Sequence, residues 1–129
     1  MPRSTKKVLV IEDDKNLVRL LKDALEGGQY TVSLALDWKE AKSHLQKLRP
    51  DIILLDILLP GESGFDVLRQ LKAHADTKNI PVVILSNLGQ EQEIRTGMDL
   101  GAVDYLVKAD IAIDQVVHKV QQVLKGKRA

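Results

Sequence analysis

The sequence predicts an α/β protein in which five parallel strands form one sheet with helices on both faces. Five short apolar runs recur along the 129 residues, rich in Val, Ile and Leu and with little polar alternation. Runs of this kind are typical of strands that are covered on both faces. Stretches with helical spacing separate the runs, and strands that alternate with helices in this way form parallel sheets.

The five predicted strands share a composition that favours a buried sheet. Only short loops and helical segments lie between them, so we predict five βα repeats, (βα)₅, with no linker or second domain. The runs are Val8–Ile11, Tyr30–Leu36, Ile52–Leu55, Val82–Leu85 and Tyr105–Val107.

Four of the five predicted helices have clear apolar stripes. The first has Asp14 at its start, where it would cap the helix, and it ends at Gly27-Gly28. The second opens with Asp37, and Glu40 three residues later completes the pattern of a capping box. The stripes of the first, second, third and last helices are Leu17, Leu21, Ala24 and Leu25; Ala41, Leu45 and Leu48; Phe65, Leu68 and Leu71; and Ile113, Val116, Val117, Val120 and Leu124.

The fourth helix, at about residues 90–100, is predicted to be the least firmly packed. It contains Gly97, and its apolar anchors reduce to Ile94 and Met98. Glycine lowers helix propensity, and few buried contacts make a segment easy to displace.

Composition limits the possible functions. Hydrophobic residues make up 44% and charged residues 29% of the chain, and the formal net charge is +1, so no basic footprint for nucleic acid stands out. The chain has no cysteine, which excludes disulfides and thiolate sites. The apolar runs are far shorter than the ~20 residues of a membrane helix. We therefore expect a cytoplasmic protein without a membrane or nucleic-acid partner.

Polar residues follow four of the predicted strands. Glu12-Asp13-Asp14 follows the first strand, Asp56 the third, Ser86 the fourth and Lys108 the fifth. In doubly wound sheets the functional site lies outside the carboxyl ends of the strands, and the flavodoxin-like order 2-1-3-4-5 makes these four strands neighbours. Alone, each residue has an ordinary interpretation as a helix cap, a turn residue or a surface charge. Together they predict one site.

Such a site suits phosphoryl chemistry. Carboxylates that lie close together repel one another unless a proton or a cation joins them, and Mg²⁺ favours carboxylate, water and phosphate oxygens. A lysine and a hydroxyl would neutralise and bind the phosphoryl oxygens. Asp56, on the central strand, is the expected nucleophile, and it would form an aspartyl phosphate.

The chain resembles the receiver domains of two-component response regulators along essentially its whole length. The similarity lies in five segments, in the family's order and spacing, which are residues 10–14, 51–56, 60–65, 81–86 and 101–108. This resemblance implies a single receiver domain over residues 1–129, with an ordered core at about 7–125. It also implies a sensor histidine kinase or histidine phosphotransfer protein as phosphoryl donor, and a downstream protein target.

The resemblance assigns a role to each site residue. Asp56 matches the phospho-acceptor, and Ser86 and Lys108 match the hydroxyl residue and the lysine that bind the phosphoryl group. Glu12 and Asp13 match the acidic pair that holds Mg²⁺ with Asp56, and Leu58 falls where the family offers a backbone carbonyl to the metal. Tyr105 falls at the aromatic switch position, which moves together with Ser86. The predicted output surface is the fourth helix, the fifth strand and the fifth helix.

Four positions depart from the family pattern. Ala109 replaces the proline that usually follows the lysine, which leaves the geometry of the Lys108–Ala109 peptide open. Trp38 replaces a frequent glycine, a change expected to matter little. Leu58 and Leu88 are apolar at positions that tune phosphoryl lifetime in the family.

Other functions remain as alternatives. A phosphatase of the haloacid-dehalogenase kind also forms an aspartyl phosphate, but it needs a second Asp where this chain has Leu58. A flavin- or nucleotide-binding module would place a phosphate where Glu12-Asp13-Asp14 would repel it. A receiver that only docks proteins would not need all five site residues. We therefore expect a switch rather than an enzyme. It would act alone, as a homodimer formed through the output surface with Asp104 and Lys119 as candidate contacts, or as the receiver of a longer chain.

Overall fold

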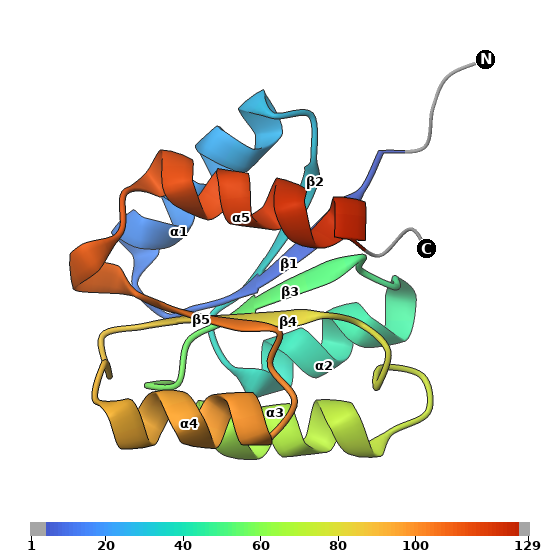
Figure 1. Cartoon of the computed structure of the whole chain (residues 1–129). Coiled ribbons are helices and arrows are strands. Elements are labelled where there is room, and N and C mark those ends of the chain that lie inside the picture. Colours follow the sequence, from blue (N-terminus) through green and yellow to red (C-terminus); the bar gives the residue numbers. More distant parts are fainter. Residues whose placement is uncertain (1–4, 127–129) are drawn as a thin grey trace.

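The computed structural model describes residues 5–126, so the ends of the domain predicted over residues 1–129 fall outside it. Within these residues five parallel strands form one sheet in the order β2-β1-β3-β4-β5, which confirms the predicted topology (Figure 1). The strands are β1 (Lys7–Ile11), β2 (Thr31–Ala35), β3 (Ile52–Leu55), β4 (Val82–Ser86) and β5 (Asp104–Val107). The helices are α1 (Lys15–Gly27), α2 (Trp38–Lys47), α3 (Gly64–Ala73), α4 (Glu91–Asp99) and α5 (Ile113–Gly126).

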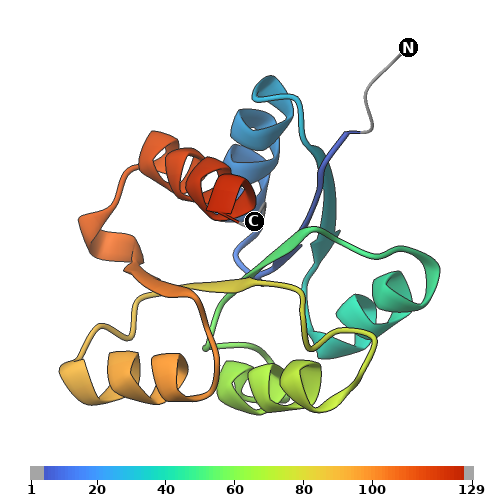
Figure 2. The ribbon, with the colours of Figure 1, turned by 45° about the vertical axis from the view of Figure 1, so that its right-hand side comes forward.

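Helices cover both faces of the sheet. α1 and α5 lie on one face and α2, α3 and α4 on the other, as the turned view also shows (Figures 1 and 2). Because side chains alternate along a strand, each strand supplies both layers. In β1, Val8 and Val10 pack in the core with α1 and α5, whereas Leu9 and Ile11 pack in the core with α2 and α3.

The helix ends follow the predicted capping signals, with one difference. The Asp14 carboxylate accepts hydrogen bonds from the amides of Asn16 (3.0 Å) and Leu17 (3.2 Å), as expected for an N-cap. The Asp37 carboxylate likewise accepts from the Glu40 amide at 2.8 Å. The Glu40 carboxylate, however, accepts from the Leu36 amide (2.7 Å), so the reciprocal bond of the predicted capping box is displaced by one residue.

The two helices beside β5 are anchored very differently. α5 buries Val116, Val120 and Leu124, whereas the only buried residue of α4 is Gly97. Ile94 packs partly against the core, but Met98, also predicted to be an anchor, is 41% exposed. A Cβ atom on Gly97 would lie 2.6 Å from Ile84 Cδ1 and 3.0 Å from the Tyr105 ring, so α4 approaches the sheet through a residue without a side chain.

The segment after β5 forms a short 3₁₀ helix, Lys108–Asp110, which the sequence did not predict. Among residues 5–126 every peptide bond is trans, which settles the geometry left open for Lys108–Ala109. None of the helices in the same range is long and apolar enough to cross a membrane.

Candidate functional site

The predicted site residues meet at the carboxyl ends of β1, β3, β4 and β5. Side chains point alternately to the two faces of the sheet, and this alternation continues to the residue after each strand. It divides the site side chains into two groups. Glu12, Asp56 and Lys108 continue the rows that face α1 and α5, whereas Ser86 and Tyr105 belong to the rows that face α3 and α4. The site therefore has a charged half and a hydroxyl half.

The charged half is built around the Lys108 ammonium. Its Nζ lies 2.6 Å from Glu12 Oε1 and 3.1 Å from Asp56 Oδ2, and both carboxylates are almost fully buried. Backbone amides bind the remaining oxygens, since the Asp14 amide donates to Glu12 Oε2 (3.0 Å) and the Leu58 amide to Asp56 Oδ1 (3.2 Å). One cation thus compensates two buried acids from distant parts of the chain.

Burial and ion pairing together set the pKa values of Glu12 and Lys108. Burial, helped by the nearby Asp56 charge, raises the pKa of Glu12 to about 7, although the hydrogen bonds from Lys108 and the Asp14 amide act in the opposite direction. Burial by itself would lower the pKa of Lys108, but its hydrogen bonds to Glu12 and Asp56 outweigh this effect and raise the pKa above its usual value. Lys108 is therefore a permanent cation, whereas Glu12 is poised to lose a proton near neutral pH.

The acidic cluster fits a hard divalent cation. Glu12, Asp13 and Asp56 can each offer one oxygen within 4.8 Å of the other two. Asp13 is exposed while Glu12 and Asp56 are buried, so the cluster opens to solvent on one side, where waters can complete an octahedral shell. Three carboxylates with one lysine leave an excess of negative charge, which Mg²⁺ would balance.

The hydroxyl half centres on the loop after β4. Ser86 is fully buried, and its Oγ accepts a hydrogen bond from the Leu88 amide at 3.3 Å. Tyr105 is 8% exposed, and its hydroxyl donates to the carbonyl oxygen of the same Leu88. Burial, and next the negative charge of Glu93, raises the pKa of Tyr105. Leu88 thus joins the two predicted switch residues.

A tight loop connects Asp56 to α3. The Gly64 amide donates to the Ile57 carbonyl (2.8 Å), which brings the first residue of α3 back against the end of β3. A Cβ atom on Gly64 would lie 2.3 Å from the Asp56 carbonyl oxygen, so only glycine fits this approach. Leu58, two residues after Asp56 in this loop, is 54% exposed.

Sequence reasoning missed a polar connection beside this loop. Trp38, expected to matter little, is 7% exposed and belongs to the core with α3; that it matters little for function stays a prediction. Its indole Nε1 donates to Gln70 Oε1 (3.2 Å), and Gln70 Nε2 donates to Glu62 Oε2 (2.5 Å). No local pattern signals this connection, because Glu62 lies before the start of α3 and Trp38 lies on α2.

Fold and site together define an α/β protein with an acidic cluster and a lysine at the switch point of a parallel sheet. The model of the family described as response regulator receiver domain matches residues 8–121. The chain belongs to this family, which confirms the resemblance inferred from its sequence.

Known proteins support the same assignment. The chain is 38% identical to the phosphate regulon transcriptional regulatory protein PhoB of Rhizobium meliloti over 102 residues, which is 79% of this chain and 45% of PhoB. It is 36% identical over 125 residues to the DNA-binding dual master transcriptional regulator RpaA of Synechocystis sp., which is 97% of this chain and 50% of RpaA. The chain thus spans half or less of the length of these relatives, and their names give no support to the expected absence of a nucleic-acid partner.

A solved structure extends the similarity to three dimensions. The phosphorylated cyanobacterial phytochrome response regulator RcpA is 33% identical and superposes with a TM-score of 0.78, covering 95% of this chain and 91% of RcpA.

Proposed function

We propose that this chain is one phospho-accepting receiver domain that takes a phosphoryl group on Asp56. Glu12, Asp13, Asp56 and the backbone carbonyl of Leu58 would hold Mg²⁺. The observation that carries the proposal is the Lys108 ammonium bound to both buried carboxylates, Glu12 and Asp56, at the switch point of the sheet. The phosphorylated state named for the relative RcpA agrees with this function.

The proposed reaction transfers one phosphoryl group without a net redox change. The P–N bond of a phosphohistidine on a histidine kinase or phosphotransfer protein breaks, and a P–O bond forms to a carboxylate oxygen of Asp56. The imidazole leaves with the electron pair of the broken bond and takes up a proton. Bound Mg²⁺ would neutralise the charge on the phosphoryl oxygens. Lys108 would exchange its bond to Asp56 for one to the phosphoryl group, and the Ser86 hydroxyl would donate to another phosphoryl oxygen.

The direct test uses acetyl phosphate as donor. With Mg²⁺ present, intact-protein mass spectrometry should show one added phosphoryl group in the wild type and none in Asp56→Ala. Asp23→Ala, which removes an exposed acid of α1, is the matched control and should behave as the wild type. A wild-type protein that stays unmodified with acetyl phosphate and with histidine phosphodonors would refute the proposal.

A hydrolase that uses the same intermediate is the competing function. Such an enzyme needs an acid–base residue two positions beyond the nucleophile, and here that residue is Leu58, whose exposed side chain has no titratable group. We therefore expect no steady-state phosphatase turnover, only slow loss of the phosphoryl group from Asp56. Rapid release of inorganic phosphate from a phosphomonoester would favour the hydrolase instead.

Phosphorylation is proposed to act through α4, β5 and α5. Phosphorylation adds charge beside Ser86, and Leu88 connects Ser86 to Tyr105 under the weakly anchored α4. Amide exchange over residues 86–108 should change when beryllofluoride and Mg²⁺ are added. No change in these residues would refute this output surface.

The nature of residue 58 should influence the lifetime of the phosphoryl group. Leu58 lies two residues after Asp56, its amide binds the Asp56 carboxylate and its side chain is exposed, so this side chain is placed next to the site. The half-life of phosphorylated Leu58→Asn should therefore differ from that of the wild type. An unchanged half-life would exclude a role for this side chain.

We further propose that the protein works in the cytoplasm, where a histidine kinase donates the phosphoryl group and a target protein binds the output surface.

A further inference from the structure

A chain of two hydrogen bonds connects α2 to the loop that follows the proposed phospho-acceptor. It runs from Trp38, the first residue of α2, through Gln70 on α3 to Glu62 in the β3–α3 loop. The distances are 3.2 Å for Trp38 Nε1 to Gln70 Oε1 and 2.5 Å for Gln70 Nε2 to Glu62 Oε2. Trp38 is the single tryptophan of the sequence.

Chemistry fixes the direction of these bonds. An indole N–H can only donate, and an ionised carboxylate can only accept. Gln70 must therefore present its oxygen to Trp38 and its NH₂ group to Glu62, because the flipped amide would lose both bonds. A glutamine in this place is specified by partners on both sides, and leucine in its place would leave the indole N–H without an acceptor.

Glu62 belongs to the loop that shapes the proposed metal site. In residues 56–64, the Leu58 amide donates to Asp56 Oδ1 (3.2 Å), and the amides of Leu59 (3.1 Å) and Gly64 (2.8 Å) both donate to the Ile57 carbonyl. These bonds close the loop at its two ends, where it joins β3 and α3. Glu62 lies in the returning half of the loop, the residues just before α3, and Gln70, which lies outside the loop on α3, binds its carboxylate.

We propose that Glu62, Gln70 and Trp38 are positioning residues for the Asp56 site. They hold the returning half of the β3–α3 loop, and through it the carbonyl and amide of Leu58, in the geometry that the metal needs. This inference rests on the proposed function for its effect on Mg²⁺, but not for its effect on the loop itself. A second consequence is that the emission of Trp38 reports movement of the loop, since the indole shares Gln70 with it.

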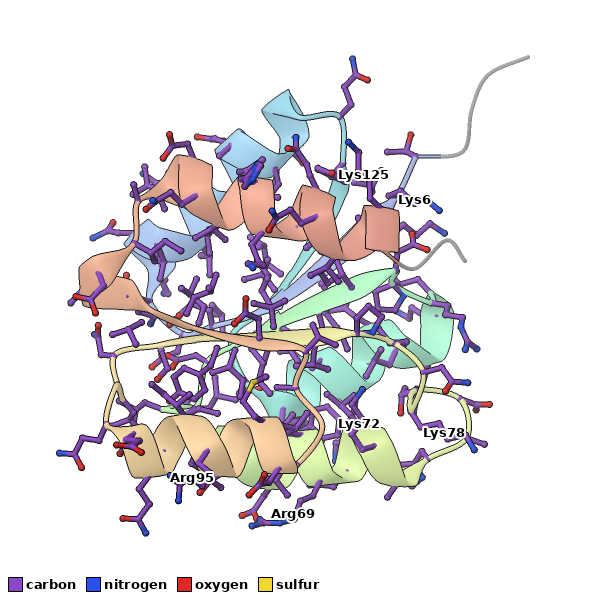
Figure 3. All side chains as sticks on the ribbon, viewed as in Figure 1. Lys6, Arg69, Lys72, Lys78, Arg95 and Lys125 are labelled. Atoms are coloured by element: carbon purple, nitrogen blue, oxygen red, sulfur yellow. The ribbon has the colours of Figure 1, made fainter. Side chains whose placement is uncertain are left out.

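The first experiment needs neither metal nor phosphate. In metal-free protein, Gln70→Leu removes both hydrogen bonds and should speed amide exchange of Leu58, Leu59 and Gly64 by about three- to tenfold. Arg69→Leu is the matched control on the same helix, because Arg69 points away from the sheet and, among residues 5–126, its ion pair is with Asp66 (Figure 3). Equal exchange in the two variants would overturn the proposal.

The second experiment is an exchange of the two partners. Gln70→Glu alone sets two carboxylates against each other and should weaken Mg²⁺ binding, measured by isothermal titration calorimetry, by about three- to tenfold. In the double variant Glu62→Gln/Gln70→Glu, the amide at 62 donates to the carboxylate at 70, which also accepts from Trp38. Both bonds return with one reversed, so Mg²⁺ affinity should recover to within about twofold of the wild type.

The outcomes separate this inference from the function on which it rests. A Gln70→Glu protein that binds Mg²⁺ like the wild type, or a double variant that stays as weak as Gln70→Glu, would overturn the positioning role. A wild-type protein that binds no Mg²⁺ would overturn the proposed function, while the exchange rates of Gln70→Leu would still decide whether the connection holds the loop.

Discussion

The bodies and the carboxyl ends of the same strands differ completely in character. β3 is formed by four buried apolar residues, Ile52–Leu55, and the next residue is the buried acid Asp56. β1 changes in the same way from Ile11 to the buried Glu12. Within one residue each of these strands passes from a side chain whose burial stabilises the fold to one whose burial destabilises it.

This difference separates stability from function along each strand. Apolar side chains on both faces stabilise the sheet and hold the strand ends in fixed positions. The acids at those ends oppose folding, because each loses hydration and they repel one another. A site of this kind is sustained by the strands beneath it. Substitutions in the two regions should therefore have opposite effects on stability and on phosphorylation.

The largest expected effect comes from the body of a strand. Leu54→Ala should lower the free energy of unfolding by about 2–5 kcal/mol, measured by urea denaturation, because Leu54 is 1% exposed in the core. Phosphorylation of the molecules that remain folded should continue. Leu20→Ala, at a leucine that is 54% exposed, is the control and should cost little. Equal losses in both variants would contradict the comparison.

The acids at the strand ends should destabilise the fold, and this effect should appear as the pH rises and Glu12 ionises. The pKa of Glu12, about 7 in the folded protein, exceeds its value of 4.5 in the unfolded chain, so folding favours the protonated acid. Its stabilising effect is full below pH 4.5 and is lost as the pH rises through 7. Metal-free protein should therefore lose on the order of 2–3 kcal/mol of stability between pH 5 and 8.

Chemical denaturation across this pH range provides the measurement. Glu12→Gln should remove most of the pH dependence and be more stable than the wild type at pH 8, whereas Asp23→Asn should leave the slope unchanged. Mg²⁺ should restore stability at pH 8, because it binds only the ionised acids. A wild type whose stability rises from pH 5 to 8 would contradict the assignment.

The smallest expected effect concerns Tyr105 on β5. This residue belongs both to the buried body of the strand and to the site at its carboxyl end. The Tyr105 ring is buried with the strand bodies, and its hydroxyl bonds the Leu88 carbonyl beside the site. Tyr105→Phe keeps the ring and should cost only about 0.5–1.5 kcal/mol in urea denaturation. The same variant should weaken the response of α4 amide exchange to beryllofluoride. An unchanged response would place Tyr105 with the strand bodies alone.

Much of the fold could be predicted because the strands are continuous apolar runs, which is the pattern of a sheet buried on both faces. Ile52–Leu55 is predicted with its observed bounds, and the predicted β2 run is two residues too long because the apolar residues Tyr30 and Leu36 flank the strand. The 3₁₀ helix after β5 has no apolar period to reveal it. Met98 was misassigned because helical spacing alone does not tell which side of a short helix faces the core.

The meeting of the candidate site residues could be predicted from the sequence, but the bonds between them could not. Strand ends place Glu12, Asp56 and Lys108 at one edge, and the structure confirms that they meet. Burial of Glu12, and with it the raised pKa, depends on neighbours from other strands that no local pattern shows. The connection of Trp38 to Glu62 depends on the distance between α2 and α3, which is a tertiary quantity.

Gly64 has a consequence for how this chain can vary over evolution. Its backbone touches the Asp56 peptide so closely that even one methyl group would collide with main-chain atoms, which cannot rotate away. A deep mutational scan should therefore find position 64 about as intolerant as position 56, although a hydrogen atom carries no chemistry. Selection can therefore keep a glycine at position 64 as strictly as it keeps the proposed nucleophile at position 56.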